Sequence, residues 1–352
     1  MNAREILAKG GAGRRAAETR MIVTICIAIC AASFVFGYVR ASGGYIAVLY
    51  GLQGVVNAFM ACVPLIAFEI KGRRLGTFSR LRRLPFIWFF LAKVALYLVV
   101  IVATIFITRW MFAYLVPQPI GFDETFREVL FFATLEALGA NLAIEIGGLV
   151  GFPTLRRVLT GRYFRPRSEE LVFAAVDMKN STGTAERLGD LDFHALLNAF
   201  FADIGDAAHD YGAEIHKYVG DEAILSWPVA AGLGESRAVL FVFSIAQRIG
   251  QRSAWYRDHF GIVPEFRAAL HVGTVAAGEI GLQRREIAYV GDTLNTASRL
   301  LDAARAAGHD VVVSQALLDR LSLPEGLIVE TLPPADAAGK REKVKLAALA
   351  LA

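Results

Sequence analysis

Four long apolar stretches in the first 150 residues constrain this chain more than any other feature. They run approximately over Met21–Val39, Tyr45–Ile70, Pro85–Ile107 and Leu130–Val150. Each is long enough to cross a bilayer as a helix, which takes about 20 residues. The first stretch is not followed by the small-residue cleavage site of a signal peptide. The sequence therefore predicts an all-α transmembrane domain of about four helices over residues 21–150.

The overall composition hides a difference between the two halves of the chain. The 352 residues are 55% hydrophobic and carry a net charge of +4, but the apolar excess lies in the first half. A basic balance could indicate nucleic-acid binding. Here, however, the Lys and Arg residues gather at the ends of the apolar stretches instead of along one face. We therefore expect a lipid bilayer around the first half and no nucleic-acid partner.

The basic residues lie on one side of the apolar stretches. They are Arg4, Lys9, Arg14, Arg15 and Arg20 before the first, Lys71, Arg73, Arg74, Arg80, Arg82 and Arg83 after the second, and Arg156, Arg157, Arg162, Arg165 and Arg167 after the fourth. The opposite loops, residues 41–44 and 118–125, are nearly free of both residue types. The positive-inside rule then predicts a multi-pass protein of the cell membrane, with both termini and the whole second half in the cytoplasm.

Charged and amide side chains interrupt the third and fourth apolar stretches. Lys93 lies in the third, and Glu136, Asn141 and Glu145 lie in the fourth. Such groups are costly in a bilayer and usually face the bundle interior, where they pair. We expect Lys93 to meet Glu145 or Glu136. A structural ion pair and a sensing role both remain open for this group.

The chain divides into four parts on this pattern. Residues 1–20 form a cytoplasmic N-terminal segment, 21–150 the transmembrane domain, 151–168 a linker and 169–350 a second domain. Pro153, Gly161 and Pro166 prevent one unbroken helix in the linker. A transducer that passes movement onward and a passive tether fit this segment equally well.

The second domain interleaves strand and helix patterns. Expected strands are Leu171–Val176, Ala213–Lys217, Glu222–Trp227, Phe266–Val272, Val275–Ile280, Glu286–Val290, Asp310–Val313, Leu327–Glu330 and Lys343–Ala347. Expected helices are Thr184–Tyr211, Glu235–Phe260, Thr293–Ala307 and Gln315–Arg320. Neither a phosphate-binding P-loop motif nor a GxGxxG motif occurs. The order suits a ferredoxin-like α+β sandwich, with a central, mostly antiparallel sheet and flanking helices.

Two aspartates stand where strands give way to turns. Asp177 ends the strand at Leu171–Val176, and Asp221 lies in the turn of the following hairpin. Two carboxylates at adjacent strand ends can hold a pair of Mg²⁺ ions on a triphosphate. Asn295 and Arg299 lie four residues apart, and so on one face of a later helix.

Together these pieces resemble the catalytic domain of the class III adenylate and guanylate cyclases, in a membrane-anchored bacterial form. The resemblance covers about Glu169 to Ala348. It implies two Mg²⁺ or Mn²⁺ ions per site, held by Asp177, Asp221 and the backbone carbonyl of Met178. The other roles that it implies are triphosphate binding by Ser181, Thr182 and Lys340, base reading by Lys217, ribose orientation by Asn295 and charge stabilisation by Arg299.

The resemblance also implies a partner and a substrate. In the family the metal aspartates come from one subunit and the lysine, asparagine and arginine from the other, which implies a head-to-tail homodimer. Lys217 favours ATP, so the expected reaction is ATP to 3′,5′-cyclic AMP and pyrophosphate. Ala288 stands where the family has a side chain that assists base reading, and Asn180 and Ser181 also depart from its pattern. A guanylate cyclase and a catalytically silent nucleotide-binding receptor module are the alternatives.

Overall fold

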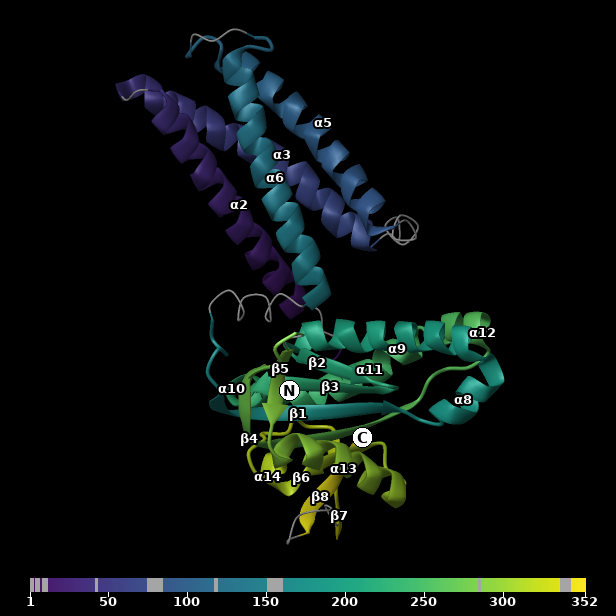
Figure 1. Cartoon of the computed structure of the whole chain (residues 1–352). Coiled ribbons are helices and arrows are strands. Elements are labelled where there is room, and N and C mark those ends of the chain that lie inside the picture. The colour runs from purple at the N-terminus through teal and green to yellow at the C-terminus, as the bar shows by residue number, and fades with distance from the viewer. Residues whose placement is uncertain are drawn as a thin grey trace. The chain divides into compact units, whose positions relative to one another are not determined.

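The computed structural model describes Ala3, Leu7 and residues 12–41, 44–74, 85–116, 120–150, 161–283, 286–335 and 343–352. It divides into two compact units (Figure 1). The helical unit is Ala17–Leu155, and the sheet unit is Met1–Ala16 together with Arg156–Ala352. Lys340 and linker residues 151–160 lie outside the described residues.

Each of the four predicted apolar stretches forms a long helix in the helical unit. The helices are α2 (Ala12–Arg40), α3 (Gly44–Arg74), α5 (Phe86–Phe112) and α6 (Glu124–Val150). Parts of α2, α3 and α5 are long and apolar enough to cross a membrane, and α6 has 27 residues. A further segment that meets the same measure, Val229–Gln251, lies in the sheet unit. There its residues from Ala238 to Ile245 are buried, Ser244 included, so it serves as a core helix.

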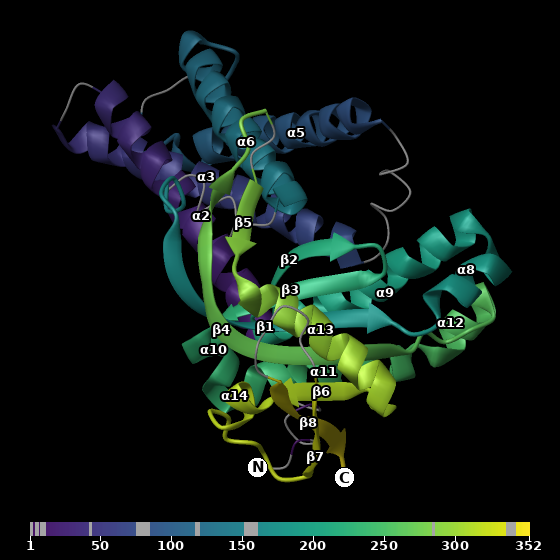
Figure 2. The ribbon, with the colours of Figure 1, turned by 60° about the horizontal axis from the view of Figure 1, so that its bottom comes forward.

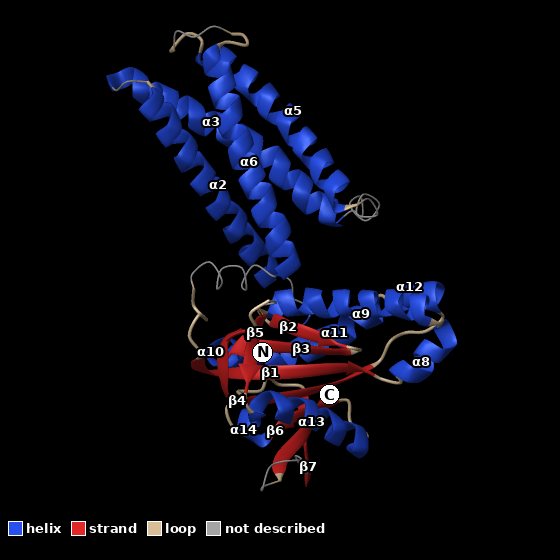
Figure 3. Ribbon diagram, in the orientation of Figure 1, coloured by secondary structure: helices blue, strands red, loops and turns tan. Residues whose placement is uncertain are grey.

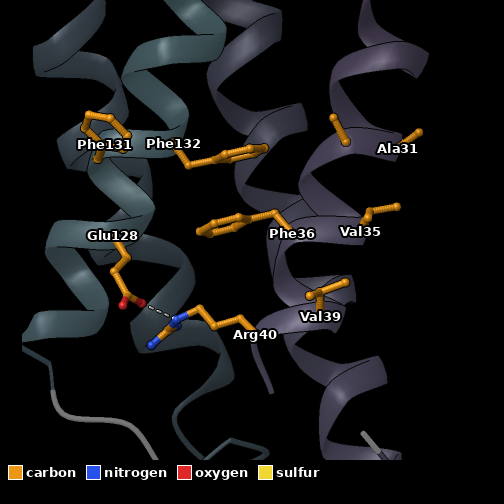
Figure 4. Close-up of a pocket in the computed structure, with 9 residues that line it drawn as sticks. Ala31, Val35, Phe36, Val39, Arg40, Glu128, Phe131 and Phe132 are labelled. Carbon is orange, nitrogen blue, oxygen red and sulfur yellow. Dashed lines mark hydrogen bonds and ion pairs between the residues drawn. The ribbon is translucent and has the colours of Figure 1, made fainter. Parts of the chain in front are cut away.

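In the described part of the chain, three side-chain pairs, polar and aromatic, join the antiparallel helices α2 and α6. They are Ser33 Oγ to Glu136 Oε2 at 3.1 Å, the stacked rings of Phe36 and Phe132 at 4.1 Å, and Arg40 Nε to Glu128 Oε2 at 2.5 Å. Figure 4 shows the last two beside an apolar groove of about 870 Å³. Helices α2 and α3 also approach each other closely. A Cβ built at Gly54 of α3 would stand 2.5 Å from the carbonyl oxygen of Ser33 in α2. Small residues permit such helix contacts in membranes.

Two ion pairs among the described residues connect α5 with α6 and with the residue that precedes α6. Lys93 Nζ lies 2.7 Å from Glu145 Oε1, which confirms the expected pairing of Lys93 with one of the two glutamates. At the other end of the helices, Arg109 Nη1 lies 2.7 Å from Asp123 Oδ1. Lys93 and Arg109 are both almost fully buried. These contacts give each of the two buried cations an anionic partner.

The sheet unit contains a mixed sheet in the order β2-β3-β1-β4-β6-β8-β7, with β5 paired to β4 (Figure 2). Its strands are β1 (Arg167–Met178), β2 (Glu214–Val219), β3 (Glu222–Pro228), β4 (Phe266–Ile280), β5 (Glu286–Val290), β6 (Val311–Ser314), β7 (Leu327–Ala335) and β8 (Val344–Leu351). All pairs are antiparallel except β4 with β6. The mostly antiparallel sheet is as predicted.

Helices cover both faces of this sheet (Figure 3). They are α8 (Ser181–Leu188), α9 (Asp190–Tyr211), α10 (Val229–Leu233), η1 (Gly234–Ser236), α11 (Arg237–Gln251), α12 (Ser253–Phe260), α13 (Asp292–Ala307) and α14 (Gln315–Leu318). Alternate β1 residues point to opposite faces. Val172, Ala174 and Val176 join the core with α9 and α11, whereas Leu171, Phe173 and Ala175 join the core with α13. The uninterrupted apolar run in β1 therefore reflects burial on both faces.

Three elements differ from the sequence expectation. The helix predicted over Thr184–Tyr211 is divided at Gly189, whose φ of 77° breaks the helix. The helix predicted over Glu235–Phe260 is divided among η1, α11 and α12. The two strands predicted around Gly273 are one strand, β4. Gly273 does not end the strand but makes room for α13, because a Cβ there would stand 2.6 Å from Thr293 Oγ1.

Candidate active site

Two acidic side chains meet at one end of the sheet. In the β1–β3 register, Asp177 pairs with Glu222, the residue after Asp221. The hairpin between β2 and β3 turns at Gly220, whose φ of 62° suits glycine. This register and this turn bring Asp221 to the end of β1, beside Asp177.

The neighbouring carboxylate influences the pKa of Asp177. Burial, followed by the charge of Asp221 and a hydrogen bond with it, raises the pKa of Asp177 to about 6. The Arg305 guanidinium opposes this shift, with Nη2 lying 3.1 Å from Asp177 Oδ2. Burial also raises the pKa of Glu222, whose Oε1 accepts a hydrogen bond of 3.0 Å from Ser298 Oγ. Negative charge is therefore concentrated where the strands end.

This donor set fits hard divalent cations. Asp177 and Asp221 offer carboxylate oxygens, and β1 ends at Met178, whose carbonyl is the third predicted ligand. Among the described residues no group of three His, Cys, Asp or Glu side chains gathers around one point. The protein thus provides a pair of carboxylates, which suits ions that take their remaining oxygen ligands from phosphate and water.

A turn into a helix follows the first aspartate. Asn180 has a φ of 52°, and α8 begins at Ser181, the residue predicted with Thr182 to hold phosphate. The Thr184 N–H is already bonded to the Asn180 carbonyl at 3.0 Å. The earlier amides of a first helical turn have no partner within their helix, and they favour anions. The position of Ser181 and Thr182 is therefore compatible with a phosphate contact.

Helix α13 presents two different faces. Ser298 and Arg305, seven residues apart, reach Glu222 and Asp177 of their own chain. Asn295 is exposed and, within the described part of the chain, makes no side-chain hydrogen bond. Arg299 lies 3.8 Å from Asp292 on its own helix, and its buried Nη1 has no hydrogen-bond partner among the described residues. Within the described residues, no hydrogen bond or ion pair therefore joins Asn295 or Arg299 to Asp177 or Asp221 of the same chain.

The predicted base-reading residues lie on β2 and β5. Lys217 is exposed, next to a bulge in β2, and Ala288 is half-buried in β5. The rings of His216 and Tyr289, their immediate neighbours in sequence, lie 4.6 Å apart. Burial, assisted by the Lys217 charge, lowers the pKa of His216 to about 4, so this ring is neutral at pH 7. In the sheet as described, strands β2 and β5 are not paired, but the contact between the His216 and Tyr289 rings joins them. Of Lys217 and Ala288, only Lys217 has a side chain that can donate a hydrogen bond to a base.

Two residues that surround Asp177, namely Glu222 and Arg305, were not predicted from the sequence. Glu222 directly follows Asp221, and a register argument on the hairpin would have placed it opposite Asp177. Arg305 needs the packing of α13 on the sheet, which no local pattern encodes. The sequence showed only that Arg305 lies seven residues after Ser298, two helical turns along the same face.

Comparison with known proteins identifies the sheet unit. Residues 167–346 match the family described as the Adenylate and Guanylate cyclase catalytic domain. The chain is 31% identical over 342 residues to Adenylate cyclase 2 of Rhizobium meliloti (strain 1021), covering 94% of this chain and 91% of that one. It is 23% identical over 152 residues to an adenylate cyclase of Anabaena cylindrica, covering 42% of this chain and 30% of that one. The solved structure of a bacterial light-regulated adenylyl cyclase aligns with a TM-score of 0.50 and 15% identity, covering 61% of this chain and 64% of that one.

The chain therefore belongs to the adenylate and guanylate cyclase family. The predicted fold class is confirmed, with a cyclase catalytic domain that has a mixed sheet and flanking helices. Long apolar helices precede that domain. The match to the Rhizobium relative extends over almost the whole chain and so includes the helical unit.

Proposed function

We propose that this protein is an integral-membrane adenylate cyclase, which converts ATP to 3′,5′-cyclic AMP and pyrophosphate at a homodimer interface. The observation that carries the proposal is the pair of interacting carboxylates, Asp177 and Asp221, at the ends of neighbouring strands. Like charges in contact are unfavourable without a cation. A nucleotide triphosphate with its divalent ions supplies that cation and the remaining oxygen ligands.

The reaction needs the ribose 3′-oxygen to attack the α-phosphorus while the bond to the pyrophosphate oxygen breaks. Mg²⁺ or Mn²⁺, two ions per site, supplies activation of the 3′-hydroxyl and neutralisation of phosphate charge. Asp177, Asp221 and the Met178 carbonyl hold these ions, and Ser181 and Thr182 hold the triphosphate at the start of α8. We assign Lys340 to the terminal phosphates by resemblance to the family alone.

A second copy of the chain completes the site. Within the described residues, no hydrogen bond or ion pair joins Asn295 or Arg299 to Asp177 or Asp221 of its own chain, and Arg299 pairs with Asp292 instead. Arg299 still has a buried nitrogen that lacks a hydrogen-bond partner in the part of the chain that the structure describes. We propose that Asn295 orients the ribose and Arg299 stabilises charge on the α-phosphate of nucleotide held by the partner subunit. Electrostatic stabilisation of this kind usually contributes more to the rate of phosphoryl chemistry than any other single effect.

The choice between ATP and GTP rests on Lys217 of β2 and Ala288 of β5. Lys217 can donate a hydrogen bond to an adenine ring nitrogen, and guanine reading usually takes an acceptor at this position. Ala288 adds no hydrogen bond of its own, which leaves a guanylate cyclase as the second candidate. We favour ATP because the cationic donor, Lys217, is present and exposed on the strand.

The helical unit anchors this activity in the cell membrane. Its helices are long enough for a bilayer, and the basic flanks support a topology with both termini and the sheet unit in the cytoplasm. That compartment contains the nucleotide triphosphates that the reaction consumes.

The direct test is to incubate membranes that contain the protein with ATP or GTP and Mn²⁺ and to measure each cyclic product. We expect cyclic AMP from ATP, and loss of product in Asp221→Ala at equal expression. Cyclic GMP as the main product would identify the guanylate cyclase. Nucleotide binding without either product would identify the silent receptor module.

A further inference from the structure

Two residues near the start of the chain are buried in the sheet unit, far along the sequence from the strands that surround them. Ala3 is fully buried and Leu7 is 7% exposed. Both have helical backbone geometry. Both also belong to the core cluster that contains β1 residues and the helices α9 and α11. A solvated leader before a membrane helix would not bury these side chains.

A backbone hydrogen bond fixes where this segment lies. The Ala3 N–H donates to the Glu325 carbonyl oxygen at 2.9 Å, and the next carbonyl, that of Gly326, accepts from the Ala352 N–H at 2.9 Å. Leu323 and Leu327, on either side of this turn, pack against the same core cluster as Leu7. The turn before β7 therefore receives residues from both ends of the chain.

We infer that the turn at Glu325 and Gly326, with the neighbouring strand pair β7–β8, is a docking surface whose occupant is the chain's own N-terminal segment. Helix α2 begins at Ala12, five residues after Leu7, and continues to Arg40 in the helical unit. The sheet unit is therefore connected to the membrane helices twice, through this docked segment and through residues 151–160.

A cross-linking experiment tests the contact itself in the full chain. Cys26, Cys30 and Cys62 are first replaced by serine, and Ala3→Cys is then combined with Glu325→Cys. Mild oxidation in membranes should form an intramolecular disulfide in this pair. The matched pair, Ala3→Cys with Leu191→Cys, uses an exposed position on α9 and should form none. Equal cross-linking in the two pairs, or none in either, would overturn the inference.

Amide hydrogen exchange tests whether the contact stabilises the sheet unit. Leu7→Asp places a charge in the core and should raise exchange of the β7 and β8 amides roughly thirtyfold, as expected when a buried leucine loses its contacts. Leu7→Met should leave exchange near that of the natural protein. Leu191→Asp, at a side chain 87% exposed, should change it little. Unchanged exchange in Leu7→Asp would contradict docking. Neither experiment depends on the cyclase reaction. A negative result in either experiment would therefore overturn docking and leave the proposed function unaffected.

Discussion

The ion pairs of the helical unit and the acidic cluster at the end of the sheet contrast in how charge is balanced. In the helical unit Lys93 meets Glu145 at 2.7 Å and Arg109 meets Asp123 at 2.7 Å, so each buried cation has an anion. In the sheet unit Asp177 and Asp221 lie together, and Arg305 is the cation that contacts Asp177. Paired charge holds an arrangement in place, whereas unbalanced charge of one sign creates affinity for an ion. The comparison separates ion pairs that hold structure from the acidic cluster that we propose as the active site.

The largest expected effect is on catalysis. Asp177→Asn keeps the shape of the side chain but removes a charged metal ligand, and we expect the rate of cyclic nucleotide formation to fall roughly thousandfold. Glu222→Gln is the matched control, because Glu222 lies opposite Asp177 but has no assigned ligand role. We expect it to retain most of the activity. If both changes had the same effect, the special role of the aspartate pair would be refuted.

Breaking the paired charge in the helical unit should cost stability instead. Lys93→Met leaves Glu145 buried without its cation, which typically costs about 3–5 kcal/mol. Thermal aggregation in detergent would show a lower midpoint. In the double variant Lys93→Met/Glu145→Leu no charge is left, and the midpoint should return to near that of the natural protein or above it. A double variant as unstable as the single one would show that the pair does more than balance charge.

Metal binding should depend on pH through Asp177. Burial and Asp221 raise its pKa to about 6, and a protonated carboxyl binds metal poorly. Mn²⁺ affinity, measured by electron paramagnetic resonance with a non-cyclisable ATP analogue, should fall about tenfold per pH unit below that value. In Arg305→Ala the opposing cation is absent, so the pKa rises and the fall should begin at higher pH. A profile that stays flat down to pH 4.5 would be inconsistent with this assignment.

The smallest expected effect is a gain in stability. Since the pKa of Asp177 in the folded protein lies above the ordinary value of about 3.9, ionisation costs stability as the pH rises from about 4 to about 6. At pH 7, without metal, Asp177→Asn should therefore raise the free energy of unfolding by about 1 kcal/mol after screening is considered. At pH 4 it should have little effect. Asp258→Asn, at an exposed position, should change stability at neither pH. A lower melting temperature for Asp177→Asn at pH 7 would contradict the account.

The sequence predicted most of the fold because the hydrophobic patterns are strong. The four apolar helices and the doubly buried run of β1 follow from composition and period alone. The sequence prediction was wrong at Gly189, which divides a helix, and at Gly273, which lies inside a continuous strand. A glycine can either end an element or continue it, so the sequence alone does not decide between the two. The paired position of Asp221 could be predicted from its hairpin. The Arg305 contact could not, since it depends on how α13 packs on the sheet.

The docked N-terminal segment shows the same limit. Ala3 and Leu7 precede a long apolar helix, and their sequence resembles the ordinary basic flank of such a helix. Their burial depends on a turn more than 300 residues away along the chain. A contact of such sequence separation carries no local signal, and only the three-dimensional structure places it in the core.

The central claim is that each site joins the aspartates of one chain to the asparagine and arginine of another. Co-expression of Asp221→Asn with Arg299→Ala tests it most directly, since each variant alone lacks one half of every site. Random pairing makes half of the dimers mixed, with one complete site in each, so activity should recover to about a quarter of that of the natural protein. If the two variant chains co-purify as dimers and activity stays at the level of the single variants, the claim is wrong.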